Sequence, residues 1–189
     1  MGQGIDMKMI GIGLVLLLAG CASLESPDPA SPYYAYAPGW ILQLNRPLTI
    51  PPNAATVRLQ YGGIVPRNGV QEQDPYCVVE LNTVSGKPQT LKPGRFEVWQ
   101  VTRSVDTLAA APSPFIKASF SGDDTGVPPQ YFKTEFRLRS ALQPNIRSMT
   151  CAWNQMGPNN PLLMRPLALG EIRGALGDWI TLIPPREHA

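Results

Sequence analysis

The sequence predicts a mainly β protein, an antiparallel β-sandwich or a small barrel with a short C-terminal helix. Three observations support this prediction. Short runs of alternating apolar and polar residues recur from Trp40 onwards, turn-forming residues separate these runs, and 21 prolines and 17 glycines disfavour long helices. We expect a single β-rich domain over residues 40–189, because a chain of 189 residues suits one core.

Several strands are predicted from patterns of period two. In residues 55–61, Val57, Leu59 and Tyr61 share the face that we expect to be buried. Arg58 and Gln60 alternate with them and fall on the polar face. Further strands, each bounded by turn-forming residues, are expected at residues 76–81, 95–102 and 115–120.

The clearest pairing is a hairpin formed by residues 131–139 and 146–153. One register, with Leu138 opposite Arg147, gathers the apolar side chains on a single face. The facing pairs in this register are Phe136 with Met149, Thr134 with Cys151, and Phe132 with Trp153. A shift of one residue would bury charged side chains, so the pattern selects this register.

A short helix is predicted within residues 166–177. Leu169, Ile172 and Leu176 recur at helical spacing, and Gly177 is a typical helix stop. We expect the apolar side of this helix to pack on the sheet. A last strand is expected over residues 179–183, before two consecutive prolines.

Upstream of the domain, the sequence has the layout of a secretory leader. Lys8 precedes an apolar run over residues 9–19, which is shorter than the roughly 20 residues of a membrane-spanning helix. We therefore expect a signal peptide over residues 1–20. Translation would start at Met1 or at Met7.

The leader ends at Leu18-Ala19-Gly20-Cys21, which resembles the lipobox of bacterial lipoproteins. The resemblance covers the leader alone. It implies that a signal peptidase cuts before Cys21, that the cysteine sulfur carries a diacylglycerol, and that the new amino terminus carries an acyl chain such as palmitate. Two or three acyl chains make a durable membrane anchor. An ordinary cleaved signal followed by a chance cysteine is the alternative.

The residues after the lipobox bear on location. In lipoproteins of enteric bacteria, an aspartate after the cysteine usually retains the protein in the inner membrane, whereas this chain has Ala22. The resemblance therefore implies the periplasmic face of the outer membrane. Residues 21–39 are rich in proline, serine and tyrosine and would form an acylated stalk. The tyrosines are expected to be incidental to a semi-extended linker, with contact to the bilayer or to the domain as alternatives.

With Cys21 lipidated, Cys77 and Cys151 remain as an even pair in an oxidising compartment, which predicts a disulfide. The bond would close a long loop and stabilise the fold by roughly 4 kcal/mol on a chain-entropy model. Two reduced, buried thiols are the alternative. A metal site is not expected, because no histidine lies near either cysteine.

Composition and missing motifs argue against several classes of function. The formal net charge of +2 predicts no strong affinity for nucleic acid. His188, the single histidine, lies next to the last residue, so nucleophiles that require a histidine base lack one. The sequence contains no nucleotide-binding or zinc-hydrolase motif, and no cofactor is expected.

Carboxylate chemistry has few candidates. Asp124 begins an Asp-Thr-Gly triplet similar to that of aspartic proteases, but the sequence has no second copy and a polar turn explains the triplet. Glu80, Glu97 and Glu135 are the strand-borne acids from which a glycosidase pair would have to come. All three fall on predicted polar faces, which favours solvated surface acids.

Lys133, Arg137 and Arg139 form a basic strip around Glu135 on the outer face of the hairpin. The strip could meet anionic lipid, an acidic glycan or a protein, and charges that keep a sheet face soluble are the alternative. The sequence thus predicts a non-catalytic binding or assembly module of the envelope, anchored through Cys21, with an unidentified protein partner. A carrier for a small apolar ligand and an envelope hydrolase that uses acidic residues are the alternatives.

Overall fold

The computed structural model describes residues 25–37, 39–107, 130–155 and 164–185. The predicted strand at 115–120 lies outside these residues. The strands are β1 (Ile41–Leu44), β2 (Leu48–Ile50), β3 (Ala54–Gln60), β4 (Gly63–Val65), β5 (Tyr76–Ser85), β6 (Gln89–Leu91), β7 (Gly94–Thr107), β8 (Gln130–Arg139), β9 (Ile146–Gln155) and β10 (Ile180–Ile183). The helices are a 3-10 turn, η1 (Arg67–Gly69), and α1 (Leu169–Leu176).

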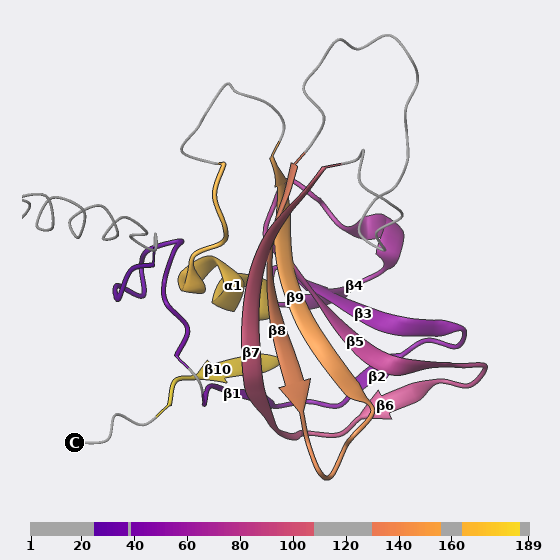
Figure 1. The fold of residues 1–189 in the computed structure, drawn as a ribbon. Helices are drawn as coiled ribbons and strands as arrows, with labels where there is room; N and C mark the ends of the chain where they lie inside the picture. Colours follow the sequence, from indigo (N-terminus) through magenta and orange to yellow (C-terminus); the bar gives the residue numbers. More distant parts are fainter. Residues whose placement is uncertain (1–24, 38, 108–129, 156–163, 186–189) are drawn as a thin grey trace, which may run out of the picture.

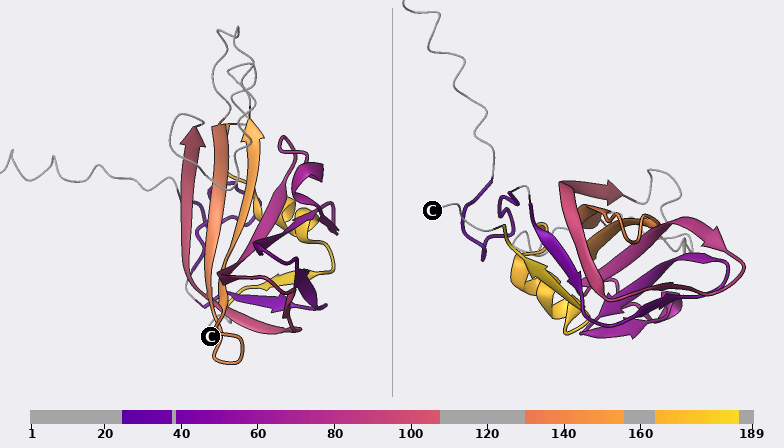
Figure 2. Two further views of the ribbon diagram at one scale, coloured as in Figure 1. Left: turned by 90° about the vertical axis from the view of Figure 1, so that its right-hand side faces the viewer. Right: turned by 90° about the horizontal axis from the view of Figure 1, so that it is seen from below.

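Eight strands form one curled antiparallel sheet in the order β10-β1-β7-β8-β9-β5-β3-β4, which gives the shape of a half-barrel (Figure 1). The long strands β7, β8 and β9 stand side by side (Figure 2), and β2 and β6 pair in a separate two-stranded sheet. Helix α1 contacts β10 near one end of the large sheet and β3 and β5 near the other. The prediction of a mainly β fold with a short C-terminal helix is confirmed.

The core lies between the curled sheet and α1. Phe136 and Met149 come from the sheet, Ile172 and Leu176 come from the helix, and all four side chains are fully buried. Burial of each such apolar side chain stabilises the fold by roughly 1.5–3 kcal/mol. Helix α1 ends at Leu176, and Gly177, with φ of 53°, caps it. The predicted helix and its stop are therefore confirmed.

The predicted hairpin is also confirmed in its register. Strands β8 and β9 pair with these facing residues: Phe132 with Trp153, Thr134 with Cys151, and Phe136 with Met149. All six side chains are buried. The period-two pattern was sufficient here because only one register buries apolar residues throughout.

One face assignment in the strand predicted at 55–61 is wrong. Tyr61 is 66 % exposed, whereas Gln60 is only 1 % exposed. Strand β3 ends at Gln60, and Tyr61 and Gly62 have φ of 53° and 74° in the tight turn that leads into β4. Positive φ at two successive residues interrupts the alternation of side chains. The pattern of the strand therefore could not be extended to Tyr61.

Part of the predicted stalk packs on the domain. Tyr34 and Tyr36 lie edge to face with Trp40, and Tyr36 contacts Phe136 at 5.1 Å between ring centroids. The guanidinium of Arg103 lies 5.3 Å above the ring of Tyr36. For Tyr34 and Tyr36, the alternative of contact with the domain therefore holds. Among the described residues, none of the helices has the length and hydropathy to span a bilayer.

Candidate functional site

A pocket lies where β3 and β4 separate. Strand β4 pairs with β3 only at residues 58–60, because Pro66 follows β4 and the chain then turns into η1. Proline has no N–H to continue a ladder. Ala54, Thr56 and Val57 therefore have a ladder partner on the β5 side alone, and Ala55 lies at an irregularity of that ladder. The space beside them is the candidate site.

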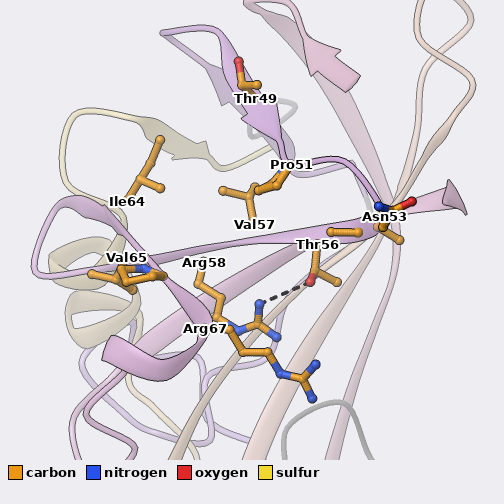
Figure 3. Close-up of a pocket in the computed structure, with 12 residues that line it drawn as sticks. Thr49, Pro51, Asn53, Thr56, Val57, Arg58, Ile64, Val65 and Arg67 are labelled. Atoms are coloured by element: carbon orange, nitrogen blue, oxygen red, sulfur yellow. Dashed lines mark hydrogen bonds between the residues drawn. The ribbon is translucent and has the colours of Figure 1, made fainter. Parts of the chain in front are cut away.

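The pocket has a volume of about 520 Å³ and three walls. Thr49 and Pro51 lie on one side, Asn53 and residues 54–58 of β3 form the floor, and residues 64–67 of β4 and the segment that follows it close the other side. Figure 3 shows β3 crossing the pocket, with Val57 and Pro51 on one side of the strand and Thr56 and Arg58 on the other. Because the pocket is centred on a strand edge, side chains from both faces of the sheet reach it.

Two guanidinium groups lie in this pocket, those of Arg58 and Arg67 (Figure 3). Arg58 Nη1 donates a hydrogen bond of 3.2 Å to Thr56 Oγ1. Burial lowers the pKa of Arg58, and the positive charge of Arg67 lowers it further. In the part of the chain that the structure describes, no carboxylate forms an ion pair with either arginine. The pocket therefore carries positive charge that these residues leave uncompensated.

The wall that carries Arg67 is held in place by the side chain of Gln60. Gln60 Nε2 donates to the carbonyl oxygen of Gln71 at 2.8 Å, and Gln60 Oε1 accepts from the Gln71 N–H at 3.0 Å. Further along the same loop, the Tyr131 hydroxyl donates to Glu72 at 2.6 Å. Burial, followed by this hydrogen bond, raises the pKa of Tyr131. The side chains of Gln60 and Tyr131 thus hold this loop at two successive residues, Gln71 and Glu72.

The lining combines one cationic part with one apolar part. Arg58 and Arg67 supply the first, and Pro51, Val57 and Ile64 supply the second. Guanidinium groups bind carboxylates and phosphates through two parallel hydrogen bonds. The lining residues include no aspartate, glutamate, histidine or cysteine. The arrangement suits an anionic group carried on an apolar body.

The predicted basic strip is not part of this pocket, and each of its cations contacts an acid. The pairs are Lys133 with Asp106, Arg137 with Glu135 at 3.0 Å, and Arg139 with Glu97 at 2.6 Å. Ion pairs of this kind reduce the field that a strip presents to a partner. The strip therefore presents a weaker positive field than its sequence indicates.

The strand-borne acids have basic partners. Besides the pairs of Glu97 and Glu135, Glu80 accepts a hydrogen bond of 3.1 Å from Arg147. The hydrogen bond from Arg139 lowers the pKa of Glu97, although Glu97 is exposed. A general acid needs a raised pKa, and Glu97 has the opposite shift. Asp124 and His188 lie outside the described residues.

Cys77 and Cys151 face each other on β5 and β9, with their sulfur atoms 2.07 Å apart and both side chains fully buried. This distance is that of a disulfide, not of two reduced thiols. Cys21, the predicted lipid attachment site, lies outside the described residues. No group of three or more metal-ligating side chains is found within the described ranges.

Sequence reasoning missed the pocket because it depends on two residues from different elements. Arg58 was placed on a polar strand face, and Arg67 belongs to a turn after a three-residue strand that was not predicted. A proline directly after a short apolar run, followed by an arginine, was the available signal. No family model, no curated protein and no solved structure matches the chain at a significant level.

Proposed function

We propose that this protein is a non-catalytic binding module of the bacterial envelope, held to the membrane by lipid on Cys21, and that its pocket binds an anionic group of a partner protein. The observation that carries the proposal is the pair of guanidinium groups, Arg58 and Arg67, in one pocket without an acidic partner among the described residues. Two like charges held together destabilise the free protein. A bound anion would remove this repulsion and gain two charge-assisted contacts.

The composition of the pocket favours binding over reaction. A hydrolase requires a nucleophile or an activated water, with a side chain that takes up a proton. The lining offers arginine, asparagine and threonine as its polar side chains, none of which is an effective base at neutral pH. These residues support recognition of a charged group.

The interior of the half-barrel gives less support to a carrier of small apolar ligands. Such a carrier needs an empty cavity inside the sheet. In the described part of the chain, Phe96, Phe136, Met149 and Ile172 fill the space between the sheet and α1. The pocket at the β3 edge lies outside this core.

The placement of the pocket fits a tethered module. Residues 25–37, the described part nearest to Cys21, lie on the left of Figure 1, and β3 and β4 lie on the right. The view from below in Figure 2 shows the same separation. A lipid on Cys21 would therefore leave the pocket on the side that faces away from the anchor.

Site-specific photocrosslinking in the native envelope tests this proposal. A photoreactive amino acid at Thr49, an exposed residue of the pocket wall, is introduced into the full-length lipoprotein. We expect a defined adduct that falls at least about tenfold when Arg58→Gln and Arg67→Gln are combined, since a charge-assisted hydrogen bond is worth about 1.5–3 kcal/mol.

The matched control combines Arg46→Gln with Arg95→Gln, which removes the same charge from exposed positions outside the pocket. Its adduct should equal that of the unchanged protein. Two outcomes would count against the pocket as the binding site. One is an equal loss of adduct in both double variants, and the other is an adduct yield that neither double variant changes. The Cys21→Ser form should lose the adduct because it lacks the tether.

A further inference from the structure

We propose that the ligand of this pocket is an extended peptide segment of the partner, which adds to the free edge of β3 as a further strand and alternates acidic with apolar side chains. The inference rests on the proposed function, because it takes the anionic group of the ligand to lie between Arg58 and Arg67. It goes further in naming the chemistry of the whole ligand and the way in which its backbone is bound.

The first argument comes from the backbone of β3. The ladder with β4 ends at Arg58. Beyond it, Ala54, Thr56 and Val57 pair with β5 alone, and the ladder with β5 is irregular between Ala54 and Thr56. The nearby strand β2 pairs with β6 and not with β3. Unpaired edges of this kind accept an added strand through main-chain hydrogen bonds. At roughly 3.3 Å per residue, the edge accommodates a segment of about four residues.

The second argument comes from the side chains that flank this edge. Leu59 faces Ile64 across the ladder and shares its face with Val57, so Ile64 and Val57 lie on one side of the sheet. Arg58 and Thr56 lie on the other side, where their side chains hydrogen-bond to each other (Figure 3). Successive side chains of an added strand point to opposite faces. One side chain of the added strand would therefore contact the two arginines, and the next side chain would contact Val57, Ile64 and Pro51.

The third argument concerns selectivity. Prolines and charged side chains at a sheet edge usually prevent indiscriminate pairing. Pro51, Pro66, Arg58 and Arg67 border this edge. A neutral strand would bury the two guanidinium groups without compensation, whereas an acidic strand would neutralise them. The same residues that block most strands therefore select one with a carboxylate at the right position.

A free anion or a membrane surface would use only part of this site. Inorganic phosphate would contact the guanidinium groups and leave both the apolar wall and the strand edge empty. An anionic bilayer would require a broad basic surface, and the basic residues of the β8 strip contact acids. A peptide strand uses the charge, the wall and the edge together.

The test uses full-length protein in a non-ionic detergent and a fluorescent, end-blocked hexapeptide in which valine and glutamate alternate. Binding is measured by fluorescence anisotropy. Three control peptides isolate the features of the proposal. One replaces glutamate with glutamine, one keeps the composition but groups the valines and the glutamates in two blocks, and one carries N-methyl groups on alternate amides, which prevents strand pairing.

We expect the alternating peptide to bind at least about tenfold more tightly than each control peptide. Combining Arg58→Gln with Arg67→Gln should weaken the binding of the alternating peptide by a similar factor. Combining Arg46→Gln with Arg95→Gln should leave this binding unchanged. Hydrogen exchange gives an independent readout. The alternating peptide should slow exchange at residues 54–57, and inorganic phosphate should not.

The outcomes separate the two proposals. If the N-methylated and block peptides bind as well as the alternating one, and the pocket arginines still matter, strand addition is refuted while anion binding stands. If phosphate or phosphatidylglycerol vesicles bind more tightly than the peptide, and this binding depends on the two arginines, the ligand is a phosphate group and the peptide proposal is refuted. If binding does not depend on Arg58 and Arg67, the proposed function is refuted as well.

Discussion

Gly177, at the end of α1, packs so closely against Gly62, in the turn between β3 and β4, that a Cβ on Gly177 would lie 2.5 Å from the Gly62 Cα. Both residues have positive φ. The Gly62 N–H donates a hydrogen bond of 3.1 Å to the carbonyl oxygen of Ala175. The contact ties the helix to the strand pair that borders the pocket.

Gly177→Ala should destabilise the protein by roughly 1–3 kcal/mol, because alanine is strained at this backbone conformation and its methyl group meets Gly62. Urea unfolding followed by circular dichroism measures the change. Gly174→Ala is the matched control, since nothing lies within 4 Å of a Cβ at that helical position. It should stabilise the protein by about 0.5–1 kcal/mol. Equal effects of the two substitutions would contradict the close contact.

Reduction of the bond between Cys77 and Cys151 should lower the free energy of unfolding by about 4 kcal/mol, because the bond joins residues 74 positions apart and restricts the unfolded chain. The comparison is between oxidised and fully reduced protein in the same urea titration. A midpoint that does not move on reduction would show that the two cysteines are not bonded in solution.

Glu171→Gln should destabilise the protein at pH 7 by about 1 kcal/mol, since Glu171 accepts the Ala168 N–H at 2.7 Å at the start of α1. Two hydrogen bonds from Arg165, both 2.8 Å, lower the pKa of Glu171 below its ordinary value of 4.5. A lowered carboxyl pKa stabilises the folded protein above the unfolded pKa and loses this effect as pH falls through the folded pKa.

The difference in unfolding free energy between the two proteins should accordingly be constant above pH 5 and shrink steadily below about pH 4.5. Urea titrations at several pH values measure it. A difference that persists unchanged at pH 2 would show that the charge of Glu171 makes no contribution.

Arg67→Gln should stabilise the fold by a few tenths of a kcal/mol while weakening ligand binding, because the charge of Arg67 acts against that of Arg58. The gain should appear at low ionic strength and disappear in 1 M salt, where charges are screened. Thermal unfolding at the two salt concentrations measures it, with Arg95→Gln, at an exposed position outside the pocket, as the control. A loss of stability at low salt would indicate that Arg67 is held by an attractive contact.

Cys21→Ser should abolish incorporation of an alkyne-tagged palmitate and shift the chain from the membrane fraction to the soluble fraction. The reason is that acyl chains on this cysteine would be the membrane anchor of the protein. Metabolic labelling followed by fractionation measures both changes. If the Cys21→Ser chain stays in the membrane fraction, the prediction that lipid on Cys21 anchors the protein is wrong.

The parts of the fold that the sequence predicts are those with long, one-sided patterns. The β8–β9 register follows from Phe136, Met149 and Cys151, because a slip of one residue would place charge in the core. Helix α1 follows from the spacing of Leu169 and Ile172. The three-residue strands β2, β4 and β6 were not predicted, because a period of two is not visible over so few residues.

The pocket could not be predicted because it is a tertiary property. Arg58 belongs to a strand with an ordinary alternating pattern, and its neighbour Arg67 comes from a turn that only the fold brings close. Gln60 was assigned to the polar face by the same alternation. It is buried because its amide bonds to the backbone of Gln71, eleven residues away. Such long-range hydrogen bonds leave no periodic signal.

Strand β1 lies between β7 and β10, so the first strand of the sheet has the last strand as its outer neighbour. Whether the chain is synthesised or exported from its amino end, β1 emerges long before β10, and the outer edge of β1 stays open until the final part of the chain is available. Pairing of segments so distant in sequence makes folding slow and exposes the unfinished sheet to aggregation. Any incomplete or truncated form that lacks β10 would therefore expose the edge of β1, and we expect chaperones to bind it.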